Sequence, residues 1–193
     1  MPTLDANYWD ERYKNKETGW DIGSVSDPLK EYIDQLTDKN IRILIPGGGN
    51  SYEALYLIEK GFTDVTVVDI SKEVCDKLIS SNTQAIEKGL KVVNANFLEF
   101  TGSFDLILEQ TFFCALDPSL RQDYALKMKT LLAPKGKLVG VLFNTDFPGG
   151  PPFGGHQSEY QALFTRFFMF VEIAPCYNSI KPRMGREVFV KIC

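Results

Sequence analysis

Residues 41–51 read Ile41-Arg42-Ile43-Leu44-Ile45-Pro46-Gly47-Gly48-Gly49-Asn50-Ser51. The first five residues form a short run that is apolar apart from Arg42 and contains three β-branched isoleucines, and the run ends at Pro46-Gly47, which is typical of a buried strand. Helix signals follow directly, because Ser51 is a suitable N-cap and Glu53 falls in the first turn. The segment therefore predicts a strand, a glycine-rich turn and a helix.

The same alternation of strand and helix continues after residue 61. Further strands are predicted at residues 65–68, 90–93, 104–108 and 137–143, and helices begin after Ser71 and at Asp117-Pro118. This order predicts an α/β fold with a parallel sheet and right-handed crossovers. After residue 143 the pattern changes to a helix at 158–167 and two strands at 168–174 and 187–192. We expect these strands to form an antiparallel hairpin at the sheet edge.

Length, composition and charge exclude several classes of protein. The chain has 193 residues, which corresponds to about one domain, and 44% hydrophobic with 24% charged residues argues against wholesale disorder. A net charge of −4 argues against a nucleic-acid partner, and no apolar run approaches the ~18 residues of a membrane span. The acidic N-terminus predicts no secretory signal. The four cysteines form no close pair of the zinc or redox type, so we expect no metal site and a cytoplasmic protein with reduced thiols. A monomer is a separate expectation, which no residue pattern supports.

The glycine turn and a later acid suggest a nucleotide-like ligand. Glycines allow a ligand to approach the backbone, and the N-terminus of the next helix offers free N–H groups. Asp69 follows the second predicted strand, about 20 residues on, where a carboxylate can accept both hydroxyls of a ribose. The alternative reading is a tight turn with a surface acid.

Two ligands fit this arrangement, a dinucleotide and S-adenosyl-L-methionine. The dinucleotide fingerprint requires a third glycine at position 52, which is Tyr52 here. Asn96 and Phe97 follow the third strand, where an amide oxygen could accept from an adenine amino group and a ring could pack nearby. Glu109 ends the fourth strand at the same edge. This pattern favours the methyl donor over a nicotinamide cofactor.

Several motifs resemble class I S-adenosylmethionine-dependent methyltransferases. The general motifs are Ile43-Leu44-Ile45-Pro46-Gly47-Gly48-Gly49, Val67-Val68-Asp69-Ile70 and Leu131-Leu132-Ala133-Pro134-Lys135-Gly136. A narrower resemblance, to the thiopurine S-methyltransferase family and its halide/thiol branch, rests on Tyr8-Trp9-Asp10-Glu11-Arg12-Tyr13, Gly19-Trp20-Asp21, Phe112-Phe113-Cys114-Ala115-Leu116-Asp117-Pro118-Ser119-Leu120-Arg121 and Gly149-Gly150-Pro151-Pro152-Phe153.

The resemblance implies a doubly wound, seven-stranded, mostly parallel sheet with an antiparallel last strand. It also implies one methyltransferase domain with an N-terminal helical lid (1–40), a donor-binding core (41–146) and an acceptor region (147–193). S-adenosyl-L-methionine would be the co-substrate and a small molecule the acceptor. The residues expected to contact the donor are Trp9, Tyr13, Trp20, Gly47, Gly49, Asp69, Ile70, Asn96, Phe97 and Glu109.

The acceptor region yields a hypothesis about reaction type. Phe147 to Gly155 has seven glycines and prolines in nine positions, which predicts a loop, and Phe153 would make its rim apolar. Arg121, Phe153 and His156 are the acceptor-site candidates. No obvious general base is present, so we expect methyl transfer to a soft nucleophile such as a thiol, hydrosulfide, halide or thiopurine. The alternatives are a catalytically silent binding module and an NAD-dependent oxidoreductase.

Overall fold

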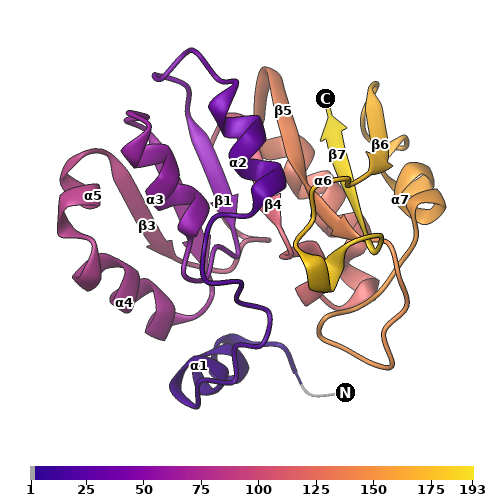
Figure 1. The fold of residues 1–193 in the computed structure, drawn as a ribbon, viewed down its shortest axis with the longest axis horizontal. Coiled ribbons are helices and arrows are strands. Elements are labelled where there is room, and N and C mark those ends of the chain that lie inside the picture. The colour runs from indigo at the N-terminus through magenta and orange to yellow at the C-terminus, as the bar shows by residue number, and fades with distance from the viewer. Residues whose placement is uncertain (1–2) are drawn as a thin grey trace.

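The computed structural model describes residues 3–193, which form one seven-stranded sheet flanked by helices (Figure 1). The strands are β1 (Ile43–Pro46), β2 (Val65–Asp69), β3 (Leu90–Asn94), β4 (Phe104–Gln110), β5 (Leu132–Phe143), β6 (Val171–Pro175) and β7 (Glu187–Ile192). The helices are α1 (Ala6–Lys14), α2 (Asp27–Asp34), α3 (Tyr52–Glu59), α4 (Lys72–Ser81), α5 (Thr83–Glu87), α6 (Arg121–Leu131) and α7 (Gln157–Phe164). Short 3-10 turns are η1 (Phe113–Ala115), η2 (Pro118–Leu120) and η3 (Lys181–Arg183).

The strand order is β3-β2-β1-β4-β5-β7-β6. Strands β1 to β5 pair in parallel, whereas β7 is antiparallel to both β5 and β6. The expected doubly wound sheet with an antiparallel last strand and an edge hairpin is therefore confirmed. The order reverses between β1 and β4, and ligands of such sheets bind outside the carboxyl ends of the strands at that point.

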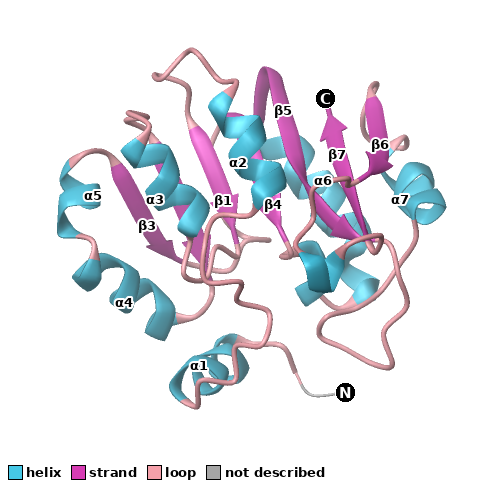
Figure 2. Cartoon of the chain, viewed as in Figure 1, coloured by secondary structure: helices cyan, strands magenta, loops and turns pink. Residues whose placement is uncertain are grey.

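Alternating side chains of the strands build two hydrophobic layers. Leu44, Val68 and Ile107 pack on one face, beneath α6 and α7, with Tyr124 and Phe164 of those helices. On the other face, beneath α2, α3 and α4, lies the second cluster of buried residues, which includes Ile43, Ile45, Val65, Val67, Leu29, Leu57 and Leu78. Figure 2 shows helices on both sides of the strands. These layers hold the strand ends, and the loops that follow them, in fixed positions.

Three predicted details are wrong. Ser51 makes no side-chain capping bond, because it adopts a left-handed conformation (φ 52°) that leaves its buried hydroxyl without a partner. Strand β5 begins at Leu132 rather than Lys137. A register shift opposite Phe104–Leu106 accommodates the segment around Pro134 and Gly136 within the strand. The last helix ends at Phe164, where the chain turns toward the edge strand.

Helix α1 lies across the edge of the sheet at which the parallel strands end (Figure 1). It has no fully buried residue, in contrast to α2, which buries Leu29 and Ile33 against the sheet. Within residues 3–193, no helix is long and apolar enough to cross a membrane. Helix α1 therefore covers the sheet edge without contributing to the main core.

Candidate functional site

A cavity of about 840 Å³ opens at the carboxyl ends of the strands. Its walls come from α1 and the segment after it, from the loops that follow β1, β2, β3 and β4, and from the segments around Phe147 and Arg183. Of the residues expected to contact the donor, eight line this cavity: Trp9, Tyr13, Trp20, Gly47, Asp69, Ile70, Asn96 and Phe97. Gly49 and Glu109 do not line it.

Asp69 is fixed by two backbone groups at the end of β2. Its carboxylate accepts an N–H from Gly49 on Oδ2 and one from Ser71 on Oδ1, both at 2.9 Å. Burial raises the pKa of Asp69, and these two N–H donors oppose that shift. The side chain is 8% exposed and faces the cavity, so each oxygen keeps acceptor capacity toward a ligand. Gly49 therefore holds the Asp69 carboxylate in place through its N–H but does not itself line the cavity.

The glycine turn allows close packing below the cavity. Gly47 and Gly49 both have positive φ (55° and 54°), which glycine adopts without steric cost. A Cβ on Gly47 would lie 2.0 Å from the ring of Phe112. A Cβ on Gly49 would lie 2.8 Å from the hydroxyl of Tyr13. Side chains here would therefore displace two aromatic residues of the cavity wall.

An N-terminal segment, residues 3–26, brings aromatic rings over the cavity. Trp20 packs edge-on against Trp9 and Tyr13, with ring centroids 5.5 and 5.9 Å apart. Burial raises the pKa of Tyr13, so its hydroxyl stays protonated. The Trp20 carbonyl accepts a hydrogen bond from Arg183 at 2.7 Å. The carboxylate of Asp21 accepts from the Asn50 amide and, at 3.2 Å, from the Tyr52 hydroxyl.

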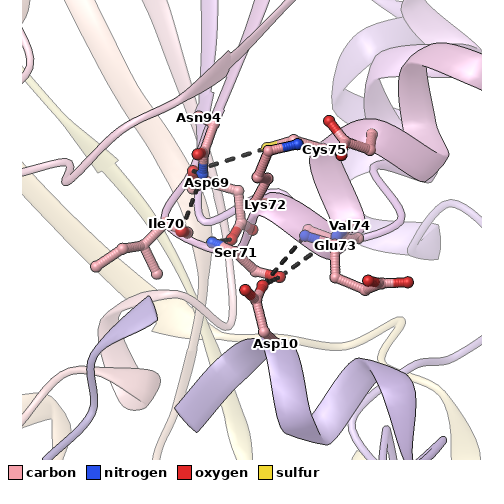
Figure 3. Close-up of polar contacts among 10 residues, drawn as sticks. Asp10, Asp69, Ile70, Ser71, Lys72, Glu73, Val74, Cys75 and Asn94 are labelled. Carbon is pink, nitrogen blue, oxygen red and sulfur yellow. Dashed lines mark hydrogen bonds and ion pairs between the residues drawn. The ribbon is translucent and has the colours of Figure 1, made fainter. Parts of the chain in front are cut away.

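A second polar attachment joins α1 to the loop that carries Asp69 (Figure 3). Oδ1 of Asp10 accepts from the Ser71 hydroxyl at 2.6 Å and from the Glu73 N–H at 3.1 Å. Ser71 also caps α4, because its Oγ accepts the N–H of Val74. The helix predicted to begin after Ser71 is therefore confirmed.

Asn96 and Phe97 form the wall beyond β3. Oδ1 of Asn96 accepts the Leu98 N–H at 3.0 Å, and its amide donates to Glu99. The amide oxygen therefore has one acceptor site left for a ligand. Phe97 is almost fully buried, with its ring 5.2 Å from that of Phe112.

Glu109 occupies a different place from the one expected. It is 0% exposed, and its oxygens accept the N–H groups of Phe112 (2.7 Å) and Phe113 (3.0 Å) and the hydroxyl of Tyr124 (2.6 Å). Burial raises the pKa of Glu109 to about 7, although these three donors lower it. Residues 107 and 109 share the face of β4 that packs on α6, so the side chain turns into the protein and supports the 111–115 turn from below.

None of the three acceptor candidates lines the cavity. Arg121 donates to the Gly154 carbonyl at 2.5 Å and stacks over Phe113 at 5.0 Å, so it joins α6 to the loop after β5. Phe153 is buried, with its N–H bonded to the Cys114 carbonyl. His156 is on the surface and lies 3.1 Å from Asp146.

A further set of cavity-lining residues, here called the acceptor end, comes from later in the chain: Phe143, Phe147, Pro151, Pro152, Arg183 and Arg186. Phe147, Pro151 and Pro152 belong to the loop in which the sequence predicts the acceptor region, whereas Phe143, Arg183 and Arg186 were not singled out. Arg183 lies over the Phe143 ring and Arg186 over the Phe147 ring, at 5.3 and 5.2 Å. The pair of arginines three apart beside Gly185 was the available signal, but no spacing rule assigns such residues to this edge.

Comparisons with known proteins agree with this architecture. A family model described as thiopurine S-methyltransferase matches residues 4–187. The chain is 30% identical over 192 residues to probable thiol methyltransferase 2 of Arabidopsis thaliana, covering 97% of this chain and 84% of the relative. It is 28% identical over 191 residues to thiocyanate methyltransferase 1 of Brassica oleracea, covering 96% and 84%.

A solved structure shows the same fold at low sequence identity. It is 1,6-didemethyltoxoflavin-N1-methyltransferase of Burkholderia thailandensis, with bound 1,6-didemethyltoxoflavin and S-adenosylhomocysteine. The TM-score is 0.71 at 18% identity, with 100% of this chain and 91% of that chain covered.

Proposed function

The chain belongs to the thiopurine S-methyltransferase family, and from that premise we propose that it transfers a methyl group from S-adenosyl-L-methionine to a small, soft, anionic nucleophile. Thiols, hydrosulfide, halides, thiocyanate and thiopurines are the acceptors in question. The observation that carries the proposal is the cavity in which Asp69, the glycine turn and three aromatic rings of the N-terminal segment meet.

The residues at the ends of β1, β2 and β3 fit the methyl donor. Asp69 offers one free acceptor position on each oxygen, which matches the two hydroxyls of a ribose. Asn96 offers an amide oxygen beside the ring of Phe97, which suits an adenine. The faces of Trp9, Tyr13 and Trp20 suit a sulfonium cation by cation–π attraction. When bound, the donor supplies an electrophilic methyl group.

The surrounding residues favour transfer by keeping water out. An anionic nucleophile and a cationic donor neutralise each other in the transition state, so a dry apolar site that stabilises separated charges poorly favours the reaction. Phe112, Phe143 and Phe147 provide such surface, and the N-terminal segment acts as a lid above it.

The acceptor end is suited to an anion that is already nucleophilic. Arg186 contributes positive charge there, which attracts an anion. Arg183 lines the same end, but its charge is paired with the Glu187 carboxylate at 3.4 Å. Arg186 has no carboxylate partner among residues 3–193. Glu109 is enclosed by its three donors, and His156 lies outside the cavity, so neither is placed to remove a proton from the acceptor. The enzyme therefore selects the anion rather than generating it.

The test is a pH–rate profile for two thiols of different pKa at saturating donor. Each curve should rise with the ionisation of its own thiol, near ~8.5 for an ordinary alkyl thiol. Alcohols and amines should show no turnover. A common midpoint for both thiols would mean that the enzyme supplies a base and would overturn the base-free reaction.

Two binding measurements separate the alternatives. Calorimetry should show that S-adenosylhomocysteine binds and that NAD does not, since Tyr52 stands where a dinucleotide site needs glycine. Binding of the donor product without turnover on any soft anion would favour a silent binding module. We also propose that the protein is a cytoplasmic monomer that binds no nucleic acid. The four free thiols support the compartment, and the net charge of −4 argues against a nucleic-acid partner.

A further inference from the structure

Helix α1 is joined to another helix, α4, by polar contacts. It has no fully buried residue, so hydrophobic packing alone does not define its position. Its N-terminal turn is capped locally by Asp5, and Arg12 pairs with Glu17 within the N-terminal segment. Asp10 is the α1 side chain whose hydrogen bonds reach another element, α4 (Figure 3).

Asp10 takes part in the capping of α4. The N-terminal N–H groups of a helix have no partner inside the helix, and a side-chain oxygen normally satisfies one of them. Here Ser71 satisfies the N–H of Val74, and Asp10 satisfies the N–H of Glu73 from a different helix. The carboxylate also lies at the positive end of the α4 dipole, which favours a negative charge.

Ser71 links this contact to the proposed ribose-binding acid. Its backbone N–H holds Oδ1 of Asp69, and its hydroxyl holds Oδ1 of Asp10. One residue thus fixes the carboxylate that faces the donor and the helix that covers it. The aromatic residues Trp9 and Tyr13 flank Asp10 on α1 and line the cavity.

We propose that Asp10 is a positioning residue that anchors α1 to the N-terminus of α4, so that the aromatic residues of the lid lie over the bound methyl donor. This inference rests on the proposed donor site. Binding is reciprocal, so if the anchor strengthens donor binding by some factor, the donor strengthens the anchor by the same factor. Loss of Asp10 should therefore weaken donor binding and leave the lid partly open even when donor is bound.

The experiment compares Asp10→Ala, Asp10→Asn and Glu11→Ala. Glu11 is the matched control, because it is an exposed acid on α1 that pairs only with Lys14 of the same helix. Calorimetry with S-adenosylhomocysteine measures donor-site affinity. Acrylamide quenching measures lid closure, because Trp9 and Trp20 are the only tryptophans in the chain and both lie in the N-terminal segment.

Asp10→Ala should bind S-adenosylhomocysteine about tenfold more weakly, as expected for the loss of hydrogen bonds to a charged group. At saturating S-adenosylhomocysteine its tryptophans should stay more accessible to acrylamide than those of the wild type. In turnover, KM for the donor should rise more than kcat falls. Asp10→Asn keeps an oxygen at the same place and should recover most of the affinity and protection, and Glu11→Ala should match the wild type.

Three results would overturn the anchoring role of Asp10. The first is that Asp10→Ala binds S-adenosylhomocysteine with wild-type affinity. The second is that Asp10→Ala binds more weakly but its tryptophans are as protected at saturation as those of the wild type, which would mean that Asp10 only caps α4. The third is that Asp10→Asn is as impaired as Asp10→Ala. The variant Asp69→Ala separates this inference from the proposed function. If Asp69→Ala loses S-adenosylhomocysteine binding while Asp10→Ala binds normally, only the anchoring role of Asp10 is refuted. If the wild-type protein binds no S-adenosylhomocysteine, both proposals are refuted.

Discussion

The two ends of the cavity are built by different kinds of backbone structure. At the donor end, Gly47, Asp69 and Asn96 lie within two residues of the ends of β1, β2 and β3, and backbone N–H groups hold the Asp69 carboxylate in place. At the acceptor end, Phe147 and Arg186 lie in segments 144–156 and 176–186, which contain no strand or α-helix and only the short 3-10 turn η3. The difference teaches that the sheet positions the proposed donor site, while loops position the proposed acceptor site.

The largest effect is expected at the donor end. Asp69→Ala should lower S-adenosylhomocysteine affinity by about a hundredfold or more, because two hydrogen bonds to a carboxylate are worth roughly 1.5–3 kcal/mol each. Asp64→Ala is the matched control, since Asp64 precedes the same strand and only pairs with Lys91 on the surface. Calorimetry on both variants provides the comparison. Equal affinities would place the ribose elsewhere.

Glu109 lies beneath the part of the cavity wall that contains Phe112, and it should make the stability of the protein depend on pH. Burial raises its pKa from 4.5 to about 7, so the folded state holds the proton more tightly than the unfolded chain. The stability that this carboxyl contributes is therefore full below about pH 4.5 and is lost as the pH rises through about 7.

The variant Glu109→Gln removes this titration while keeping an oxygen for Phe112 and Phe113. As the pH rises from about 5 to about 8, the free energy of unfolding of Glu109→Gln should increase relative to that of the wild type by on the order of 3 kcal/mol. Urea unfolding of both proteins across this range measures the difference. Parallel pH curves would show that Glu109 titrates normally in the folded protein.

A smaller effect is expected at the acceptor end. Arg186→Gln should raise KM for an anionic acceptor by about tenfold, because one charged contact is lost, and should leave S-adenosylhomocysteine affinity unchanged. Lys181→Gln is the control, being a nearby exposed cation outside the cavity wall. If both variants raise KM equally, the effect is one of general surface charge rather than of a site.

The smallest effect is expected at His156. Its pairing with Asp146 is on the surface, where such contacts contribute little. His156→Ala should keep kcat and KM within about twofold of the wild type at every pH tested. A tenfold loss of kcat together with an altered pH profile would restore His156 as the base and contradict the base-free reaction.

The amino-acid pattern was sufficient for the donor end because its information is local. The strands at residues 43–46 and 65–69 are continuous buried runs separated by one helix, an order that favours a parallel sheet, and parallel strands bring their carboxyl ends to one edge. Asp69 and Gly47 could therefore be placed together from spacing alone. Glu109 was misplaced because a strand end has two faces, and its neighbour Ile107, which packs toward α6, indicates the buried one.

By itself, then, the sequence determined the sheet, the glycine turn and the acid at the end of β2, since each depends on neighbours a few residues away. Only the tertiary structure decided which distant segments meet: Asp10 with Ser71, Trp20 with Arg183, and Arg121 with Gly154. These contacts join residues 61, 163 and 33 positions apart. No periodicity encodes such pairs, because they follow from how helices and loops pack once the sheet exists.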